Sequence, residues 1–259
     1  SSTQSHESNS LARSCRGVLL AATAGGVLAF CSLGADAMAA VLGGSEEVQG
    51  FAATYFAVRC LALPGWFVLT AAGQAFQGMG DTRTPMHANL LANGLNIALD
   101  AVLVLGIGPI PSLGVAGAAW ATAIAFSVGA GLLVWKLWAK RGWGQPERRD
   151  VVDIVRVGAP IGARWLADVS GWALLTALLS RLGAAEVAAT QMVVRIIGVS
   201  FLPGYGISEA ASIGVGQHIG GNREAAVWRT FRSALALSTL VMAVFGLVFW
   251  FAPTPILRL

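Results

Sequence analysis

The chain has 259 residues, of which 56% are hydrophobic and only 12% are charged. Soluble domains carry about 25% charged residues, so the composition excludes an ordinary soluble protein and indicates a polytopic membrane protein. Three cysteines are too few for a disulfide-stabilised secreted fold. The net charge of +4 does not indicate nucleic-acid binding, because the basic residues lie in short segments between apolar ones.

Seven apolar stretches are long enough to cross a bilayer, which takes roughly 20 mostly apolar residues in a helix. No stretch alternates with a period of two, as strands of a membrane barrel would. We therefore predict an all-α polytopic membrane protein built as a helical bundle. The predicted spans are about residues 16–33, 51–78, 86–106, 114–138, 157–180, 187–215 and 226–251.

Basic residues lie almost entirely at one set of span ends, twelve against two at the other set. Cytoplasmic loops carry the excess of Lys and Arg, so we expect the N-terminus and the loop at 139–156 to be cytoplasmic. That loop is the longest polar stretch inside the chain and predicts a domain boundary. The expected organisation is a polar N-terminal segment (1–15), four spans (16–138), a cytoplasmic linker (139–156) and three spans (157–259).

Six charged residues stand out inside the predicted spans, where a charge costs about 2.5–3.5 kcal/mol and usually serves a function. They are Arg59, Asp100, Arg164, Asp168, Arg195 and Glu209. The clearest case is the third span, in which Asn89, Asn93, Asn96 and Asp100 are spaced i, i+4, i+7 and i+11. A period of 3.6 residues places all four on one stripe. We expect this stripe to line a polar cavity or a packed interface, because polar groups facing lipid would be unsatisfied.

Asn96 and Asp100 together offer an amide oxygen and a carboxylate, which suits binding of Na⁺ or a proton. For Asn89 and Asn93 the favoured interpretation is structural, namely hydrogen bonds to neighbouring helices. For Asp100 the favoured interpretation is functional, because a carboxylate is a costly way to hold helices together.

The fifth span carries Arg164 and Asp168 at i, i+4. Either the two form an intrahelical ion pair, or Asp168 faces a cavity and binds a cation while Arg164 extends to the surface. Glu209 lies in a Gly- and Ser-rich half-span and is expected to reach the headgroups. Trp172 is a candidate cavity residue, although a place in the aromatic belt or the core is favoured.

No sequence motif for an enzyme is present. HExxH, GxSxG and the phosphate-binding GxxxxGK[ST] do not occur. Both lysines, Lys136 and Lys140, lie near the start of the 139–156 linker, so neither is at mid-membrane. Carboxylates inside the bilayer without a nucleotide site favour an ion-coupled secondary transporter, with no cofactor other than H⁺ or Na⁺ as the coupling ion.

Several motifs, in order, resemble the multidrug and toxic compound extrusion (MATE) family. They are QGMGDTRTPM at 77–86, NIALD at 96–100, GVAGAAWAT at 114–122, GAPIGARWLAD at 158–168, RLGAAEVAATQ at 181–191 and GISEAASIGVGQHIGGNREAA at 206–226. The resemblance implies a two-lobe bundle of twelve helices that exports cationic or amphipathic compounds against Na⁺ or H⁺ entry and works as a monomer in the cytoplasmic membrane. The seven spans resemble its third to ninth helices.

The resemblance also implies site residues. Asn96, Asp100 and Thr122 match the family's N-lobe cation site, whose further Asp lies on the first helix, and Asp168 matches an acidic residue of a C-lobe site. The cavity and substrate candidates are Asn93, Arg164, Trp172, Gln191 and Glu209. Because the chain starts without Met and stops abruptly, we expect truncation at both ends. Two alternatives stay open: a related lipid-linked oligosaccharide flippase, and a non-transporting membrane fragment.

Overall fold

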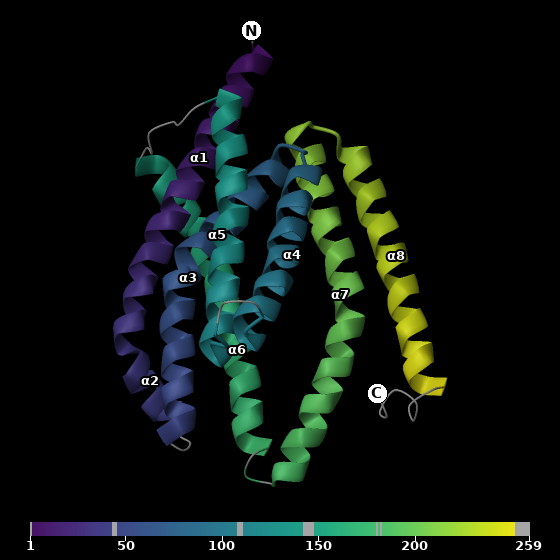
Figure 1. The fold of residues 1–259 in the computed structure, drawn as a ribbon. Coiled ribbons are helices and arrows are strands. Elements are labelled where there is room, and N and C mark those ends of the chain that lie inside the picture. Colours follow the sequence, from purple (N-terminus) through teal and green to yellow (C-terminus); the bar gives the residue numbers. More distant parts are fainter. Residues whose placement is uncertain are drawn as a thin grey trace. The chain divides into compact units, whose positions relative to one another are not determined.

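The structure is a computed structural model, and it describes residues 2–42, 46–107, 111–141, 148–179, 181 and 183–251. The all-α prediction is confirmed over these residues (Figure 1). The centre of the predicted linker, residues 142–147, lies outside them. The elements are α1 (Ser2–Ala29), the 3-10 helix η1 (Phe30–Gly34), α2 (Ala35–Leu42), α3 (Glu46–Gly78), α4 (Arg83–Leu105), α5 (Gly114–Arg141), α6 (Arg148–Leu179), α7 (Ala184–Gly220) and α8 (Glu224–Phe251).

The chain divides into two compact units, Ser1–Val155 and Arg156–Leu259. The division falls inside the stretch predicted as a linker, but helices enter that stretch from both sides. Helix α5 ends at Arg141, immediately before a glycine, and α6 starts at Arg148, soon after Pro146. Helical residues therefore make up most of the stretch that the sequence predicted as a linker.

Six helical segments of the described chain, rather than seven, are long and apolar enough to cross a membrane. The span predicted at 157–180 is covered by α6, which is long enough at 32 residues but is not among these six apolar segments. The charged Arg164 and Asp168 near its middle lower its hydropathy. The six segments are Arg16–Ala40, Glu46–Gly78, Arg83–Leu105, Gly114–Ala139, Glu186–Gly220 and Glu224–Phe251.

The first predicted span, 16–33, is not one straight helix. Helix α1 ends at Ala29, η1 tightens the chain over Phe30–Gly34, and α2 continues to Leu42. Short 3-10 segments are common at helix ends, because i→i+3 bonds tighten the last turn. The apolar segment thus extends further than predicted, to Ala40.

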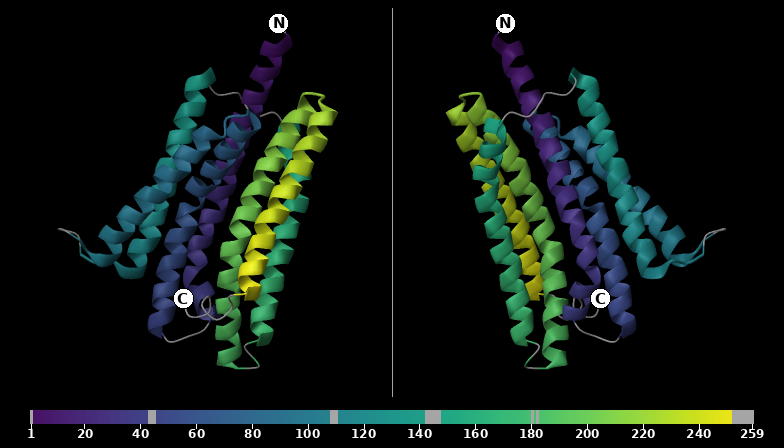
Figure 2. Two further views of the ribbon diagram at one scale, coloured as in Figure 1. Left: turned by 90° about the vertical axis from the view of Figure 1, so that its right-hand side faces the viewer. Right: turned by 90° about the vertical axis from the view of Figure 1, so that its left-hand side faces the viewer.

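Helix α3 is the centre of unit 1, packed against α1 on one side and α5 on another, and α5 packs in turn against α4 (Figure 2). The two clusters of buried side chains lie along these contacts. They consist of Val18, Leu69, Ala72, Phe76, Ala88, Ala130, Leu133 and Leu137, and of Val58, Ala62, Ala119 and Ala123. Half of these residues are alanines, which let the helix backbones approach closely.

The approach of α1 to α3 depends on Gly25, which is placed against Pro64 inside α3. A Cβ at Gly25 would lie 2.6 Å from Pro64 Cα. We expect Gly25→Ala to lower the free energy of unfolding by about 1–3 kcal/mol, because the two backbones must separate. Thermal unfolding of the purified protein in detergent measures the effect.

The neighbouring Gly26 provides the matched control, since a Cβ there meets no atom within 4 Å. Gly26→Ala is expected to leave the melting temperature unchanged or raise it slightly, because alanine restricts the unfolded chain. Equal melting temperatures for the two variants would contradict the proposed close contact.

The turn from α3 to α4 is fixed by local hydrogen bonds. The amide of Gly80 donates to Gln77 O at 2.9 Å and the amide of Asp81 donates to Phe76 O at 2.9 Å. This pattern closes a helix with a glycine at positive φ, and Gly80 has φ of 85°. Asp81 then accepts from the amide and the hydroxyl of Thr84, at 3.0 and 2.8 Å. The motif at 77–86 therefore sets how α4 leaves α3.

In unit 2, helices α7 and α8 run side by side (Figure 2). Gly204 lies against Met242 and Gly214 lies against Thr230. A Cβ at Gly204 would lie 3.3 Å from Met242 Sδ, and a Cβ at Gly214 would lie 3.2 Å from Thr230 Cγ2, so the two helices are in close contact at both positions. Many large apolar side chains of these two helices remain exposed, for example Leu202 at 67% and Trp250 at 81%. Apolar surface of this extent requires lipid or further helices as its surroundings.

Candidate functional site

The polar stripe of α4 meets α5 at Asn96 and Thr122. The side-chain amide of Asn96 donates to Thr122 Oγ1 at 3.4 Å, and that hydroxyl donates to Ala118 O at 3.0 Å. The 3.4 Å contact is longer than the usual range for a strong N–H···O bond, so it is weak and costs little to break. Both side chains are half-buried between the two helices.

Asp100 lies one helical turn beyond Asn96 on the same stripe and is also half-buried. Its Oδ1 atom is buried and has no hydrogen-bond partner in the structure. An ionised oxygen without a partner carries an uncompensated desolvation cost. A cation or a proton at this oxygen would remove that cost, which is the arrangement expected of a site that binds and releases one.

The oxygen chemistry of this group suits a small, hard cation. Because Asn96 uses its amino group to donate, its carbonyl oxygen is left as an acceptor, alongside the Thr122 hydroxyl and the Asp100 carboxylate. Oxygen ligands favour hard cations over transition metals. Over the described residues, no three His, Cys, Asp or Glu side chains cluster as ligands of a metal. The structure thus brings Asn96 and Thr122 together, and Asp100 lies one turn further along α4.

Asn89 and Asn93 bond within their own helix rather than to a neighbouring one, which corrects the expectation from the sequence. Asn89 donates to Pro85 O at 2.9 Å and Asn93 donates to Asn89 O at 2.8 Å. The partner in each case is a carbonyl oxygen, so the amino half of the amide must face it. Each amide oxygen is consequently directed away from its own backbone.

Asn93 also borders a cavity of about 270 Å³ at the end of unit 1 where α3 turns into α4. Helices α3 and α4 contribute amide side chains to the cavity, and α3 also contributes a hydroxyl group. One aromatic residue comes from α3 and another from α5. Its lining residues are Trp66, Leu69, Thr70, Gly73, Gln74, Gln77, Pro85, Asn89, Asn93 and Phe126.

The sequence analysis missed the α3 side of this cavity. Thr70, Gln74 and Gln77 follow the same i, i+4, i+7 spacing that singled out the α4 stripe. That spacing was available in the sequence as a second polar stripe within an apolar span. Thr and Gln are weaker signals of function than Asp, because the free-energy cost of placing an uncharged side chain in the bilayer is lower than that of a charged one.

Arg164 and Asp168 form an ion pair on α6, with Nε to Oδ2 at 3.9 Å and both side chains exposed within their unit. This is the geometry of the intrahelical alternative. Trp172, one turn further, is 55% exposed. A cation-binding role of Asp168 stays a prediction.

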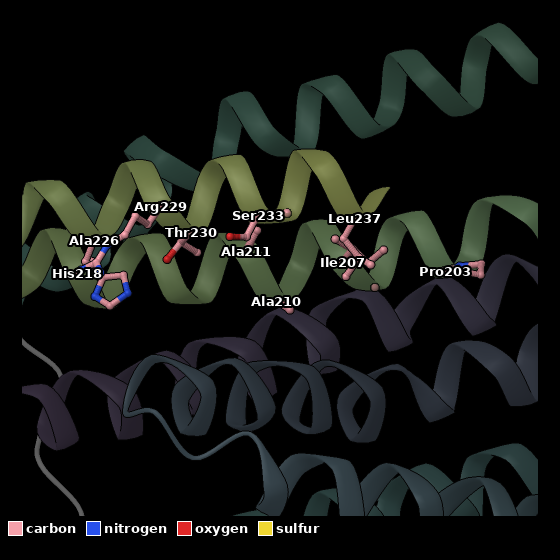
Figure 3. A pocket seen from close by; sticks show the side chains of 12 residues that line it. Pro203, Ile207, Ala210, Ala211, His218, Ala226, Arg229, Thr230, Ser233 and Leu237 are labelled. Atoms are coloured by element: carbon pink, nitrogen blue, oxygen red, sulfur yellow. The ribbon is translucent and has the colours of Figure 1, made fainter. Parts of the chain in front are cut away.

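Gln191 and Glu209 lie on α7, the first exposed and the second half-buried. Together with Arg164 and Trp172, they lie outside both the small cavity of unit 1 and a larger one of about 750 Å³ in unit 2. The larger cavity is an open groove between α7 and α8. Figure 3 shows His218 and Arg229 near one end of it and Pro203 at the other.

Comparison with known proteins identifies a shared family. The MatE family profile matches residues 12–102 and 160–259. The "Probable multidrug resistance protein NorM" of Thermotoga maritima is 30% identical over 219 residues, which cover 82% of this chain and 47% of that protein. The protein of the same name from Deinococcus radiodurans is 35% identical over 155 residues, 58% of this chain and 34% of that protein. The chain spans about half the length of the curated relatives it matches.

Solved structures share the fold. The crystal structure of MATE in complex with MaD3S superposes with a TM-score of 0.83 at 23% identity, covering 94% of this chain and 56% of that chain. A MOP superfamily transporter from Pyrococcus furiosus, described as having a binding pocket of reverse polarity, gives 0.83 at 23% identity over 94% of this chain and 55% of that one. The chain therefore shares its fold with these solved structures.

Proposed function

Because this chain belongs to the MatE family of transporters, we propose that the protein exports cationic or amphipathic small molecules by exchange against H⁺ or Na⁺. The chain is an integral membrane protein and not an enzyme. Its relatives named for multidrug resistance support drug efflux as the broad function. The exchange mode, the coupling ion and the cationic character of the substrates are parts of the proposal.

The observation that carries the proposal is the unpartnered carboxylate oxygen of Asp100, one helical turn beyond the hydrogen-bonded pair of Asn96 and Thr122. An exchanger needs a group whose occupancy changes the relative stability of two conformations, because a ligand shifts an equilibrium only by its differential affinity. A cation at Asp100 would add a bond between α4 and α5 that is absent when the site is empty. Its arrival would favour the packing in which the two helices are drawn together and thereby weaken drug binding.

The coupling step would then proceed by alternating access, as in other transporters built from two bundles. A cation that enters at Asp100 biases the first unit toward one packing, and its release returns the unit to the other. We propose the cytoplasmic membrane as the location, with the N-terminus and residues 139–156 on the cytoplasmic side. The excess of basic residues at those span ends supports this orientation.

An ethidium efflux assay with the full-length protein tests the proposal. Cells preloaded with ethidium are expected to lose it faster than vector controls, and the rate is expected to depend on external Na⁺ at fixed pH or on pH at fixed Na⁺. A flippase for lipid-linked oligosaccharides would leave ethidium efflux at the control level and transfer a labelled lipid instead. A protein that transports neither would contradict the proposal and support the membrane-fragment alternative.

A further inference from the structure

The small cavity of unit 1 is lined by uncharged residues, half of them polar and half apolar, and lies beside the α3–α4 turn. Gln77 in the last turn of α3 and Pro85 in the first turn of α4 place it at that end of the helices. Its volume of about 270 Å³ has room for about nine waters at roughly 30 Å³ each. A drug-sized ligand needs about 300–1,000 Å³, so the cavity fits small hydrated species better than whole substrates.

The α4 wall of the cavity presents oxygen acceptors. The side-chain amino groups of Asn89 and Asn93 both donate hydrogen bonds to backbone carbonyls one turn earlier in α4. Their amide oxygens are left to accept from water or to contact a cation. Trp66 and Phe126 also line the cavity, and aromatic faces attract cations.

Two of the three helices that line the cavity, α4 and α5, continue to the Asp100 site. Asn96 is three residues beyond Asn93 on α4, and Thr122 is four residues before Phe126 on α5. The Asn96–Thr122 hydrogen bond therefore lies one turn beyond the cavity lining. Asp100 follows one turn later, about 10 Å from Asn93 along the helix axis at 1.5 Å per residue.

We propose that this cavity is the vestibule through which a hydrated monovalent cation passes between Asp100 and the membrane face at the α3–α4 turn, with the Asn96–Thr122 hydrogen bond as its gate. The inference rests on the proposed function, because a cation that exchanges at Asp100 needs a path to the membrane surface. It adds to that function the location of the path. The lining groups bind a cation weakly because they are neutral, and weak binding along the way is what allows an ion to leave again. The long 3.4 Å bond at the gate opens at little cost.

Cysteine accessibility tests the vestibule without relying on transport. In full-length protein whose native cysteines are replaced by alanine, Asn93→Cys is compared with Leu91→Cys. Leu91 lies two residues, or about 200° of helix rotation, from Asn93 and is 48% exposed away from the cavity. A membrane-impermeant, positively charged methanethiosulfonate reagent is applied to sealed vesicles of either orientation.

The expected result is that Asn93→Cys reacts at least tenfold faster than Leu91→Cys, and only from the side of the α3–α4 turn. A negatively charged methanethiosulfonate is compared with the positive one after each rate is divided by that reagent's rate with a free thiol in solution. On this scale the negative reagent is expected to react at least tenfold more slowly at Asn93→Cys. Equal rates at the two positions, reaction from the opposite side only, or no preference for the positive reagent would overturn the proposal.

The gate is tested with Asp100→Cys combined with Thr122→Ala or Thr122→Ser. Both Thr122 variants lose the methyl group, but only serine keeps the hydroxyl that accepts from Asn96. From the turn side, Asp100→Cys is expected to react at least tenfold faster with Thr122→Ala than with Thr122→Ser. Equal rates would remove the hydrogen bond as a gate.

These outcomes separate the route from the proposed function. Labelling requires only a water-filled path, so a positive result together with absent ethidium efflux would retain the vestibule and reject the exporter. Normal cation-dependent efflux with an unreactive Asn93→Cys would retain the exporter and reject the vestibule.

Discussion

Replacing Asp100 by asparagine is expected to reduce ethidium efflux and drug resistance to the level of cells without the protein. The variant keeps the size of the side chain, removes its negative charge and replaces one carboxylate oxygen with an amino group. Without that charge the oxygen group around Asn96 and Thr122 loses most of its attraction for a cation. Efflux from preloaded cells, together with the amount of protein in isolated membranes, measures the effect.

The stability of this variant is expected to change in the opposite direction from its activity. Asp100 Oδ1 is buried without a hydrogen-bond partner, and a buried unpaired charge destabilises a fold more than a neutral amide does. Asp100→Asn should therefore melt at or above the wild-type temperature. A general folding defect would lower efflux and melting temperature together, so the two readouts distinguish a mechanistic loss from a structural one.

Asp36→Asn is the matched control, since it makes the same chemical change at an exposed position of α2. It is expected to keep wild-type efflux. Wild-type resistance in Asp100→Asn cells would remove Asp100 from the mechanism. Loss of efflux in both variants would mean that the loss in Asp100→Asn is not specific to the Asp100 site.

The spans could be predicted from the sequence where apolar length alone decides them. For the predicted span at 114–138 the structure has α5 over Gly114–Arg141, and for 226–251 it has α8 over Glu224–Phe251. Bilayer thickness sets the minimum length of such runs. The 3-10 segment η1 and the helical ends inside the predicted linker were not predictable, because backbone hydrogen bonding rather than hydropathy decides where a helix tightens or stops.

The candidate site was predictable in part. Helical periodicity alone placed Asn96 and Asp100 on one stripe, whereas the choice of Thr122 came from the family resemblance. The length of the Asn96–Thr122 contact and the missing partner of Asp100 Oδ1 depend on how α4 and α5 pack. The back-bonding of Asn89 and Asn93 depends on side-chain rotamers. Neither kind of information is contained in residue spacing.

The packing of α4 on α5 is thus what converts a polar stripe into a site, and Gly117 is where that packing is closest. A Cβ at Gly117 would lie 2.5 Å from Leu103 O and 2.7 Å from the Leu103 carbonyl carbon. The Leu103 oxygen is already held by the amide of Leu113 at 2.8 Å. It cannot move aside without losing that hydrogen bond, so a side chain at Gly117 must push the two helices apart.

Gly117→Ala is therefore expected to lower the free energy of unfolding by about 3 kcal/mol, the upper part of the range for overpacked sites. Efflux is expected to fall as well, because the contact is close to the site. Gly117 is five residues from Thr122, about 7.5 Å along α5, and Leu103 is three residues from Asp100, about 4.5 Å along α4. Separation of the helices here lengthens the Asn96–Thr122 contact, which is already 3.4 Å.

Gly131→Ala, on the same helix, separates this effect from the general effect of alanine. A Cβ at Gly131 meets no atom within 4 Å, so the substitution is expected to raise stability by up to about 1 kcal/mol through helix propensity and to leave efflux unchanged. The same melting temperature for Gly117→Ala and Gly131→Ala would show that α4 and α5 tolerate separation. Reduced stability with normal efflux in Gly117→Ala would show that exchange does not require close contact of α4 and α5 at this end, because the cation site would then work with the two helices apart.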